Sequence, residues 1–227
     1  MAKKTTRQTV EKTARSTEER LLDTAELMFS KYGYSGVSLR MISEAASANS
    51  AAIHYYFRSK QGLLRAVMAR RCDGLNAERM AMLDECEREA VDGIPDIAKV
   101  VTAFVAPVVR LGKTPGEKAF KEFYGFTAFD PNPEVREIVK EFFDPFARRF
   151  VDMISRARPD LSREELFFRL SLIYGTLGYV RANPPRLREV LGDDLSFADG
   201  EKCLHFVIPA LVAGMAFPPV GPMDGGD

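Results

Sequence analysis

Hydrophobic residues in most of the chain recur every three or four positions, and no alternating run typical of a β-strand stands out. The clearest pattern follows Ser16–Glu19, a capping-box sequence, and continues through Leu21, Ala25 and Phe29. Gly33 then suits the end of a helix. The pattern predicts an all-α protein whose first helix has about four turns.

Two very short helices and one long helix are predicted next. Ser38 can cap a short helix, and Asn49 or Ser50 can cap another of about two turns that ends near Phe57. Ser59 can cap a long helix from Lys60 to about residue 89. A short helix, a tight turn and a second short helix have the spacing of a helix-turn-helix, which we place between Ser38 and Phe57.

Residues 52–60, A-I-H-Y-Y-F-R-S-K, have the chemistry of a helix that enters a DNA groove. Small side chains at Ala51 and Ala52 let the backbone approach bases, and His54 and Tyr55 can donate to phosphates or bases. Ile53, Tyr56 and Phe57 are expected to pack inward on the opposite face. Lys60 and the helix start beside it can bind a phosphate.

Charge is distributed unevenly although the formal net charge is zero. Residues 1–71 carry 13 Lys/Arg against 6 Asp/Glu, and the remainder carries 19 against 26. A basic N-terminal part favours a polyanionic partner. Five of the 13 cations lie in residues 1–15, however, so a chance imbalance with a basic arm explains the difference equally well.

The run A-x-A-N-x-A-A-I-H-Y-Y-F-R-S-K-x-x-L-L closely resembles the signature of the TetR family of transcriptional repressors. The resemblance covers residues 16–71 and implies double-stranded operator DNA as a partner. One departure is Ser47, which stands where the turn usually holds glycine. Carried over by position, the implied DNA contacts are Ser38, Arg40, Asn49, Ser50, Ala51, Ala52, His54, Tyr55 and Lys60. Arg40 is the candidate for reading a guanine edge.

The second half of the chain is rich in phenylalanine, with eight of 16 between residues 120 and 150. A hydrophobic core accounts for most of them, but the family's layout also implies an effector pocket for an apolar ligand, an acyl compound being one candidate. The expected pocket residues are Phe104, Phe120, Phe123, Tyr124, Phe126, Phe143 and Phe146. Arg110, Lys118 or Lys121 could neutralise an anionic group on such a ligand.

Segments 162–182 and 199–216 are apolar on more than one face, which favours a four-helix interface between two copies of the chain. Two buried helices of a monomer are the alternative. The expected interface residues are Leu170, Tyr174, Leu177, Val207, Leu211 and Gly214.

Other classes of protein find little support. No H-E-x-x-H, G-x-S-x-G or glycine-rich phosphate loop is present, and the two histidines are far apart in sequence, so neither enzyme activity nor a metal or cofactor site is predicted. Three dispersed cysteines and the lack of a signal peptide or long apolar stretch predict a reduced, cytoplasmic protein without a membrane span. An all-α protein-interaction module is the remaining alternative function.

The predicted organisation has four parts. They are a flexible basic arm (1–15), the helix-turn-helix domain (16–71), an effector-binding and dimerisation domain (72–216) and a disordered tail (217–227).

Overall fold

The computed structural model describes residues 16–127, 130–192 and 195–221, which form helices and connecting loops without a strand. The predicted arm and the last six residues of the predicted tail lie outside these ranges. The described helices are α1 (Thr17–Tyr32), α2 (Leu39–Ala45), α3 (Ser50–Phe57), α4 (Lys60–Arg88), α5 (Ile97–Val109), α6 (Pro115–Thr127), α7 (Pro133–Ala157), α8 (Arg163–Ala182), α9 (Arg186–Leu191) and α10 (Gly200–Ala216). The all-α prediction is confirmed.

Side-chain caps set the starts of the first four helices, as the sequence predicts. The Ser16 hydroxyl accepts from the Glu19 amide, and the Glu19 carboxylate accepts from the Ser16 amide. Asn49 caps α3 and Ser59 caps α4 through bonds to amides of the first turn. These bonds satisfy amides that lack a partner within the helix and so define where each helix begins.

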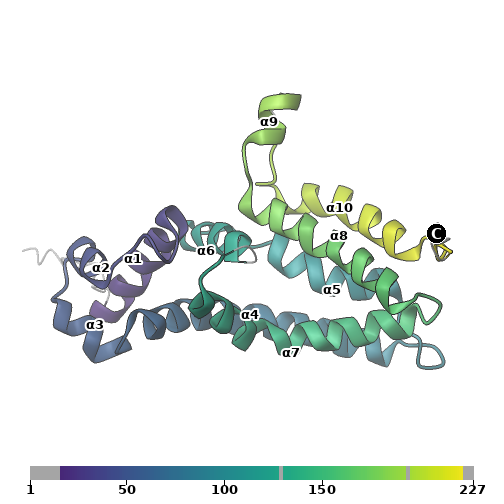
Figure 1. The fold of residues 1–227 in the computed structure, drawn as a ribbon, viewed down its shortest axis with the longest axis horizontal. Coiled ribbons are helices and arrows are strands. Elements are labelled where there is room, and N and C mark those ends of the chain that lie inside the picture. The colour runs from purple at the N-terminus through teal and green to yellow at the C-terminus, as the bar shows by residue number, and fades with distance from the viewer. Residues whose placement is uncertain (1–15, 128–129, 193–194, 222–227) are drawn as a thin grey trace, which may run out of the picture.

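The helices divide into a small head and a larger body (Figure 1). Helices α1, α2 and α3 form the head at one end, and α4 runs from it along the body beside α7. Helices α8 and α10 lie over α5 on the other side of the body. None of the described helices has a stretch that is both long and apolar enough to cross a membrane.

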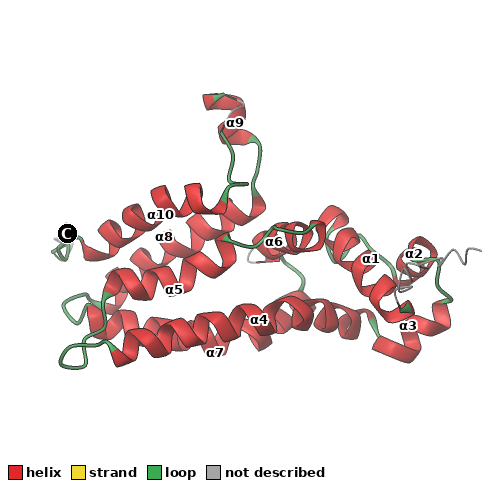
Figure 2. Cartoon of the chain, turned by 180° about the vertical axis from the view of Figure 1, so that it is seen from behind, coloured by secondary structure: helices red, strands yellow, loops and turns green. Residues whose placement is uncertain are grey.

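Helix α9 was not predicted from the sequence. It is only six residues long, begins after Pro185 and has no side-chain cap, so it lacks the usual signals of a helix start. It projects away from the body in both views (Figure 2). None of its residues is buried.

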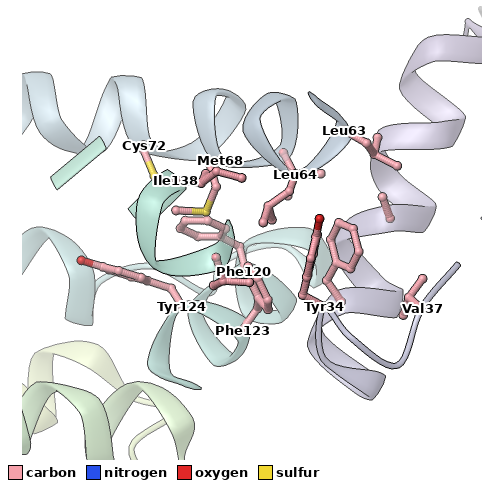
Figure 3. Close-up of a cluster of buried hydrophobic side chains, with 14 of the residues drawn as sticks. Tyr34, Val37, Leu63, Leu64, Met68, Cys72, Phe120, Phe123, Tyr124 and Ile138 are labelled. Carbon is pink, nitrogen blue, oxygen red and sulfur yellow. The ribbon is translucent and has the colours of Figure 1, made fainter. Parts of the chain in front are cut away.

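One hydrophobic core joins the head to the body. Phe29 of α1 stacks on Phe123 of α6, with ring centroids 5.9 Å apart. Tyr34 lies beside the same residues, and Leu64 and Met68 of α4 close the core from above (Figure 3). A movement of α6 or α4 is therefore passed to the head by direct packing, since well-packed interiors transmit strain.

Candidate nucleic-acid interface

Helix α3 has one buried face and one exposed face. Ile53 and Phe57 are buried against the head, whereas Ala51, His54 and Tyr55 are exposed. The Ala51 amide donates to Asn49 Oδ1 at 2.9 Å, which holds the helix start in place. The exposed face therefore carries only a small side chain at its N-terminal end, and hydrogen-bonding groups follow one turn later.

Most of the residues expected to contact DNA are accessible to solvent. Ser38, Arg40, Asn49, Ser50, Ala51, His54 and Tyr55 are exposed, and Ala52 and Lys60 are half-buried. The side chains of Ser38 and Asn49 also cap α2 and α3, so these two residues position the helices as well as lining the surface.

The Arg40 side chain is held by Glu44 in the protein without DNA. Arg40 Nε donates to Glu44 Oε1 at 2.7 Å, and this bond raises the pKa of Arg40. Both side chains are well exposed, and exposed ion pairs contribute little to stability. The Arg40–Glu44 pair therefore costs little free energy to break.

Lys60 lies where the head meets the body. Its Nζ is 4.2 Å from the ring centroid of Tyr34, and the Tyr34 hydroxyl donates to Glu134 of α7 at 2.6 Å. Burial lowers the pKa of Lys60, and Glu134 opposes this shift. Tyr34 thus links Lys60 to the first turn of α7.

The prediction that Tyr56 packs inward is wrong. Its side chain is exposed, and its ring meets that of Tyr55 edge to face with centroids 5.0 Å apart. Together with Thr17 of α1 it lines a shallow groove beside α3. Position 56 follows Tyr55 by about 100° around the helix, which leaves it at the boundary between the two faces. Sequence reasoning missed both groove residues, although the paired tyrosines were a usable signal for Tyr56.

The turn between α2 and α3 is strained at Ser47, where φ is 50°. Left-handed backbone is unfavourable for residues with a Cβ, and glycine removes the penalty. We expect Ser47→Gly to raise the free energy of unfolding by about 1 kcal/mol. Urea denaturation of the two proteins measures the difference, with Ala48→Gly as the control that should not stabilise. An unchanged or lower value for Ser47→Gly would contradict the strain argument.

The aromatic residues expected to line a pocket are mostly brought together in the body. Phe104, Phe120, Phe123, Tyr124, Phe143 and Phe146 are buried. Phe126 does not join them, because 54% of its surface is exposed. Each three-residue step turns a helical position by about 60°, so a second step after Phe123 carries the side chain off the shared face.

The buried rings form two stacks. Phe104 stacks on Phe146 and on Phe150, with centroids 5.6 and 4.2 Å apart. Tyr124 stacks on Phe143 at 4.3 Å and on Phe120 at 5.9 Å. We call these six residues the aromatic cluster. It joins α5, α6 and α7.

The residues expected at a dimer interface are only partly accessible. Leu177 and Leu211 are buried within the protomer, because α8 and α10 turn these faces toward the body where α5 packs. They are removed from the candidate interface. Leu170, Val207 and Gly214 are half-buried, and Tyr174 is 41% exposed.

A different set of apolar side chains is exposed on the same two helices. Phe168 and Leu172 on α8 and Phe206 on α10 each expose 60% or more of their surface. Sequence reasoning included the buried Leu177 and Leu211 because both faces of these helices are apolar, and periodicity alone does not say which one meets the body.

No group of three or more His, Cys, Asp or Glu side chains within the described ranges is arranged to hold a metal ion. Burial raises the pKa of Cys72 to about 12, so its thiol is protonated at neutral pH.

Two family models match the chain. The model described as bacterial regulatory proteins, tetR family, matches residues 21–67, and the model described as tetracyclin repressor-like, C-terminal domain, matches residues 102–214. The probable HTH-type transcriptional regulator YttP of Bacillus subtilis (strain 168) is 36% identical over 59 residues. That alignment covers 26% of this chain and 28% of the relative, so it is confined to a small part of both proteins.

Solved structures share the fold over most of their length. A mutant of the HlyIIR protein superposes with a TM-score of 0.57 and 15% identity, covering 88% of this chain and 97% of that one. The transcriptional regulator FadR from Bacillus subtilis, in complex with stearoyl-CoA, superposes with a TM-score of 0.55 and 14% identity, covering 86% and 98%. The two family models and the shared fold agree with the geometry of α2 and α3. The chain belongs to the TetR family of transcriptional regulators and carries the family's helix-turn-helix DNA-binding domain.

Proposed function

We propose that this protein is a repressor that binds a palindromic operator as a homodimer and is released from it by an apolar small-molecule effector. The observation that carries the DNA-binding part is the exposed face of α3, which presents Ala51, His54 and Tyr55 on a helix anchored by Ile53 and Phe57. A helix with small exposed side chains at its N-terminal end can place its backbone against base edges in the major groove.

The contacts divide into two kinds. Arg40 is exposed on α2 and can read the O6 and N7 atoms of guanine. Lys60 and the start of α4 suit a phosphate, which fixes position without reading sequence. This division supports sequence-specific binding and makes separate predictions for the two residues.

The dimer is supported by apolar side chains that the protomer leaves uncovered. Leu172 of α8 and Phe206 of α10 are 62% and 64% exposed. A groove between α9 and α10 is lined by Leu191, Phe197 and Phe206 and continues the same apolar surface. A two-fold pair of such surfaces covers them mutually and sets two α3 helices against half-sites about 34 Å apart.

The effector part is supported by the contact between the body and the head. Helix α6 belongs to the aromatic cluster through Phe120 and Tyr124, and Phe123 on the same helix stacks on Phe29 of α1. A ligand that displaces α6 therefore moves the head. A hundredfold loss of DNA affinity requires about 2.7 kcal/mol of preference for the displaced state. The neighbour FadR, whose structure holds stearoyl-CoA, is a precedent for an acyl ligand in this fold.

The experiment begins with selection of genomic DNA fragments by the purified full-length protein, followed by titration of the recovered site at several salt concentrations. Arg40→Ala is expected to weaken operator binding about ten- to hundredfold while non-specific binding changes little. Lys60→Ala is expected to weaken all sequences alike and to lower the salt slope by about one.

Three results would contradict separate parts of the proposed function. Equal losses on operator and unrelated DNA would make Arg40 a phosphate contact instead. Recovery of sites without two-fold symmetry would contradict the dimeric operator. Failure to recover any preferred sequence, with binding insensitive to salt, would favour the alternative of a protein-interaction module.

A further inference from the structure

The body contains buried arginines that no carboxylate neutralises. Arg79 of α4 retains 1% of its surface, Arg181 of α8 retains 5%, and neither forms an ion pair within the described ranges. A buried charge without a counter-charge is unfavourable by several kcal/mol, and proteins normally avoid it.

The other buried arginine of the body shows how this chain satisfies such a group for purely structural purposes. Arg169 of α8 pairs with Glu165 and donates to the carbonyls of Gly214, Met215, Phe217 and Pro218. It thereby ties the end of α10 to α8.

Arg79 is much less well satisfied. One terminal nitrogen donates to the Phe104 carbonyl at 3.0 Å, and the guanidinium also interacts with the Tyr124 hydroxyl. Its Nε is buried without a hydrogen-bond partner. Its guanidinium carbon lies 4.7 to 6.0 Å from the ring centroids of Phe146, Phe104 and Phe143. Cation–π contacts recover part of the lost hydration, but they do not neutralise the charge. Arg79 therefore lies between the two stacks of the aromatic cluster with donor capacity unused.

Arg181 also lies beside Tyr124 and adds to the positive charge around Arg79. Its guanidinium is 4.1 Å from the Tyr124 ring centroid, and its Nε donates to the Leu177 carbonyl at 3.0 Å. The C-terminal end of α8 favours a cation at this position, whereas Arg79 lies in the middle of its helix and has no such help. Burial lowers the pKa of Arg79, Tyr124 opposes this, and Arg181 lowers it further.

A third cation, Lys121 of α6, is buried nearby and donates to the Val109 carbonyl at 2.8 Å. Burial lowers its pKa, and Arg181 is among the groups that lower it further. By contrast, Arg110 pairs with Glu201 at the surface and Lys118 is exposed. The only fully buried carboxylate in the described ranges is Glu26, which belongs to the head and binds Arg70 and Arg71.

We propose that Arg79 and Arg181 bind the anionic head group, a carboxylate or phosphate, of an effector whose apolar part is held by the aromatic cluster. Guanidinium groups match the oxygen geometry of both anions and bind them through paired hydrogen bonds. Tyr174, which is 41% exposed, meets Phe104 edge to face at 5.0 Å and so connects the cluster to the surface. The inference rests on the proposed effector function and names the chemical class of the ligand.

The arrangement also explains how anion binding in the body would change the position of the head. Arg79 belongs to α4, which begins at Lys60, and Arg181 faces Tyr124 of α6, which packs on α1. An anion bound by both arginines would offset their mutual repulsion and so change the positions that α4 and α6 prefer. Both helices contact the DNA-binding head directly.

The test measures binding of three probes with the same apolar chain to the full-length protein. Dodecanoate and dodecyl phosphate carry anionic heads, and dodecanol is neutral; all are used below their aggregation concentrations. Calorimetry and the thermal midpoint are expected to show at least tenfold tighter binding of one or both anions than of dodecanol. The stronger of the two anions identifies carboxylate or phosphate as the preferred head.

Substitutions test how much each of the two arginines contributes to the preference for an anionic probe. Arg79→Met and Arg181→Met are each expected to remove most of the preference for the anion, whereas Arg110→Met, which alters an exposed arginine, should keep it. Without any probe, Arg79→Met should have a thermal midpoint equal to or above that of the wild type, while Arg169→Met should have a lower one, because it leaves Glu165 unpaired.

Three results would overturn the proposal: equal affinity of the wild type for anions and alcohol, no binding of either anion, or an anion preference that survives in both Arg79→Met and Arg181→Met. The wild-type comparison needs no variant and stands even if one fails to fold. Operator binding without a probe is measured in parallel, so loss of DNA recognition is separated from loss of anion recognition.

Discussion

Phe206→Glu is expected to convert the protein to a monomer and to weaken operator binding at least a hundredfold. Phe206 is 64% exposed on α10, so the substitution should not disturb the protomer's own core. In a two-fold interface each copy contributes the same residue, so two carboxylates would enter an apolar contact without partners. Loss of the dimer removes the second half-site contact, which contributes a factor of about 10² to 10⁴ in avidity.

Sedimentation and operator titration measure the two effects on one preparation. Phe126→Glu is the matched control, because Phe126 is also exposed but lies on α6. It should remain dimeric. Leu211→Glu is a poor probe of the interface, since that side chain is 8% exposed and a carboxylate there would destabilise the protomer itself. A dimer of unchanged stability in Phe206→Glu would move the interface away from this face of α10.

Ala51→Glu is expected to lower operator affinity at least a hundredfold without destabilising the fold. Ala51 is exposed in the first turn of α3, where an acidic side chain interacts favourably with the helix dipole. On DNA the same carboxylate would face phosphates and base edges at close range, and the longer side chain would hold the helix away from the groove.

Ala51→Gln separates size from charge. It has nearly the same shape as the glutamate variant without the negative charge, so it should retain more affinity and a steeper salt dependence than Ala51→Glu. Thermal unfolding checks that both variants fold. Wild-type affinity in Ala51→Glu would show that α3 does not enter the groove with this end, and the assignment of α3 as the recognition helix would fail.

The local elements of this protein follow from its sequence. Ser16 with Glu19, Asn49 and Ser59 predicted three helix starts that the structure confirms, because a cap is a contact between a side chain and amides two or three residues away. The surface of α3 was predictable for the same reason. A two-turn helix with Ile53 and Phe57 one turn apart can bury only one face, so the other must be exposed.

Contacts between distant helices were decided by the tertiary structure. Apolar periodicity identified α8 and α10 as two-sided, but packing on α5 chose Leu177 and Leu211 for the core and left Leu172 and Phe206 outside. Helix α9 escaped prediction because six residues without a cap carry too little local information.

The buried arginines give the sharpest contrast between the two levels. In the sequence, Arg79 and Arg181 look like ordinary charged positions of helices, and Arg110 was one of the three candidates for binding an anion. The fold buries the first two beside Tyr124 and leaves the third at the surface beside Glu201. Hydration and counter-charge depend on which side chains meet in space, and residues 79 and 181 both lie beside Tyr124 only because α4, α6 and α8 come together in the body. The sequence by itself thus determined all of the described helices except α9, together with the exposed face of α3, whereas the charge inside the body was decided by how those helices pack.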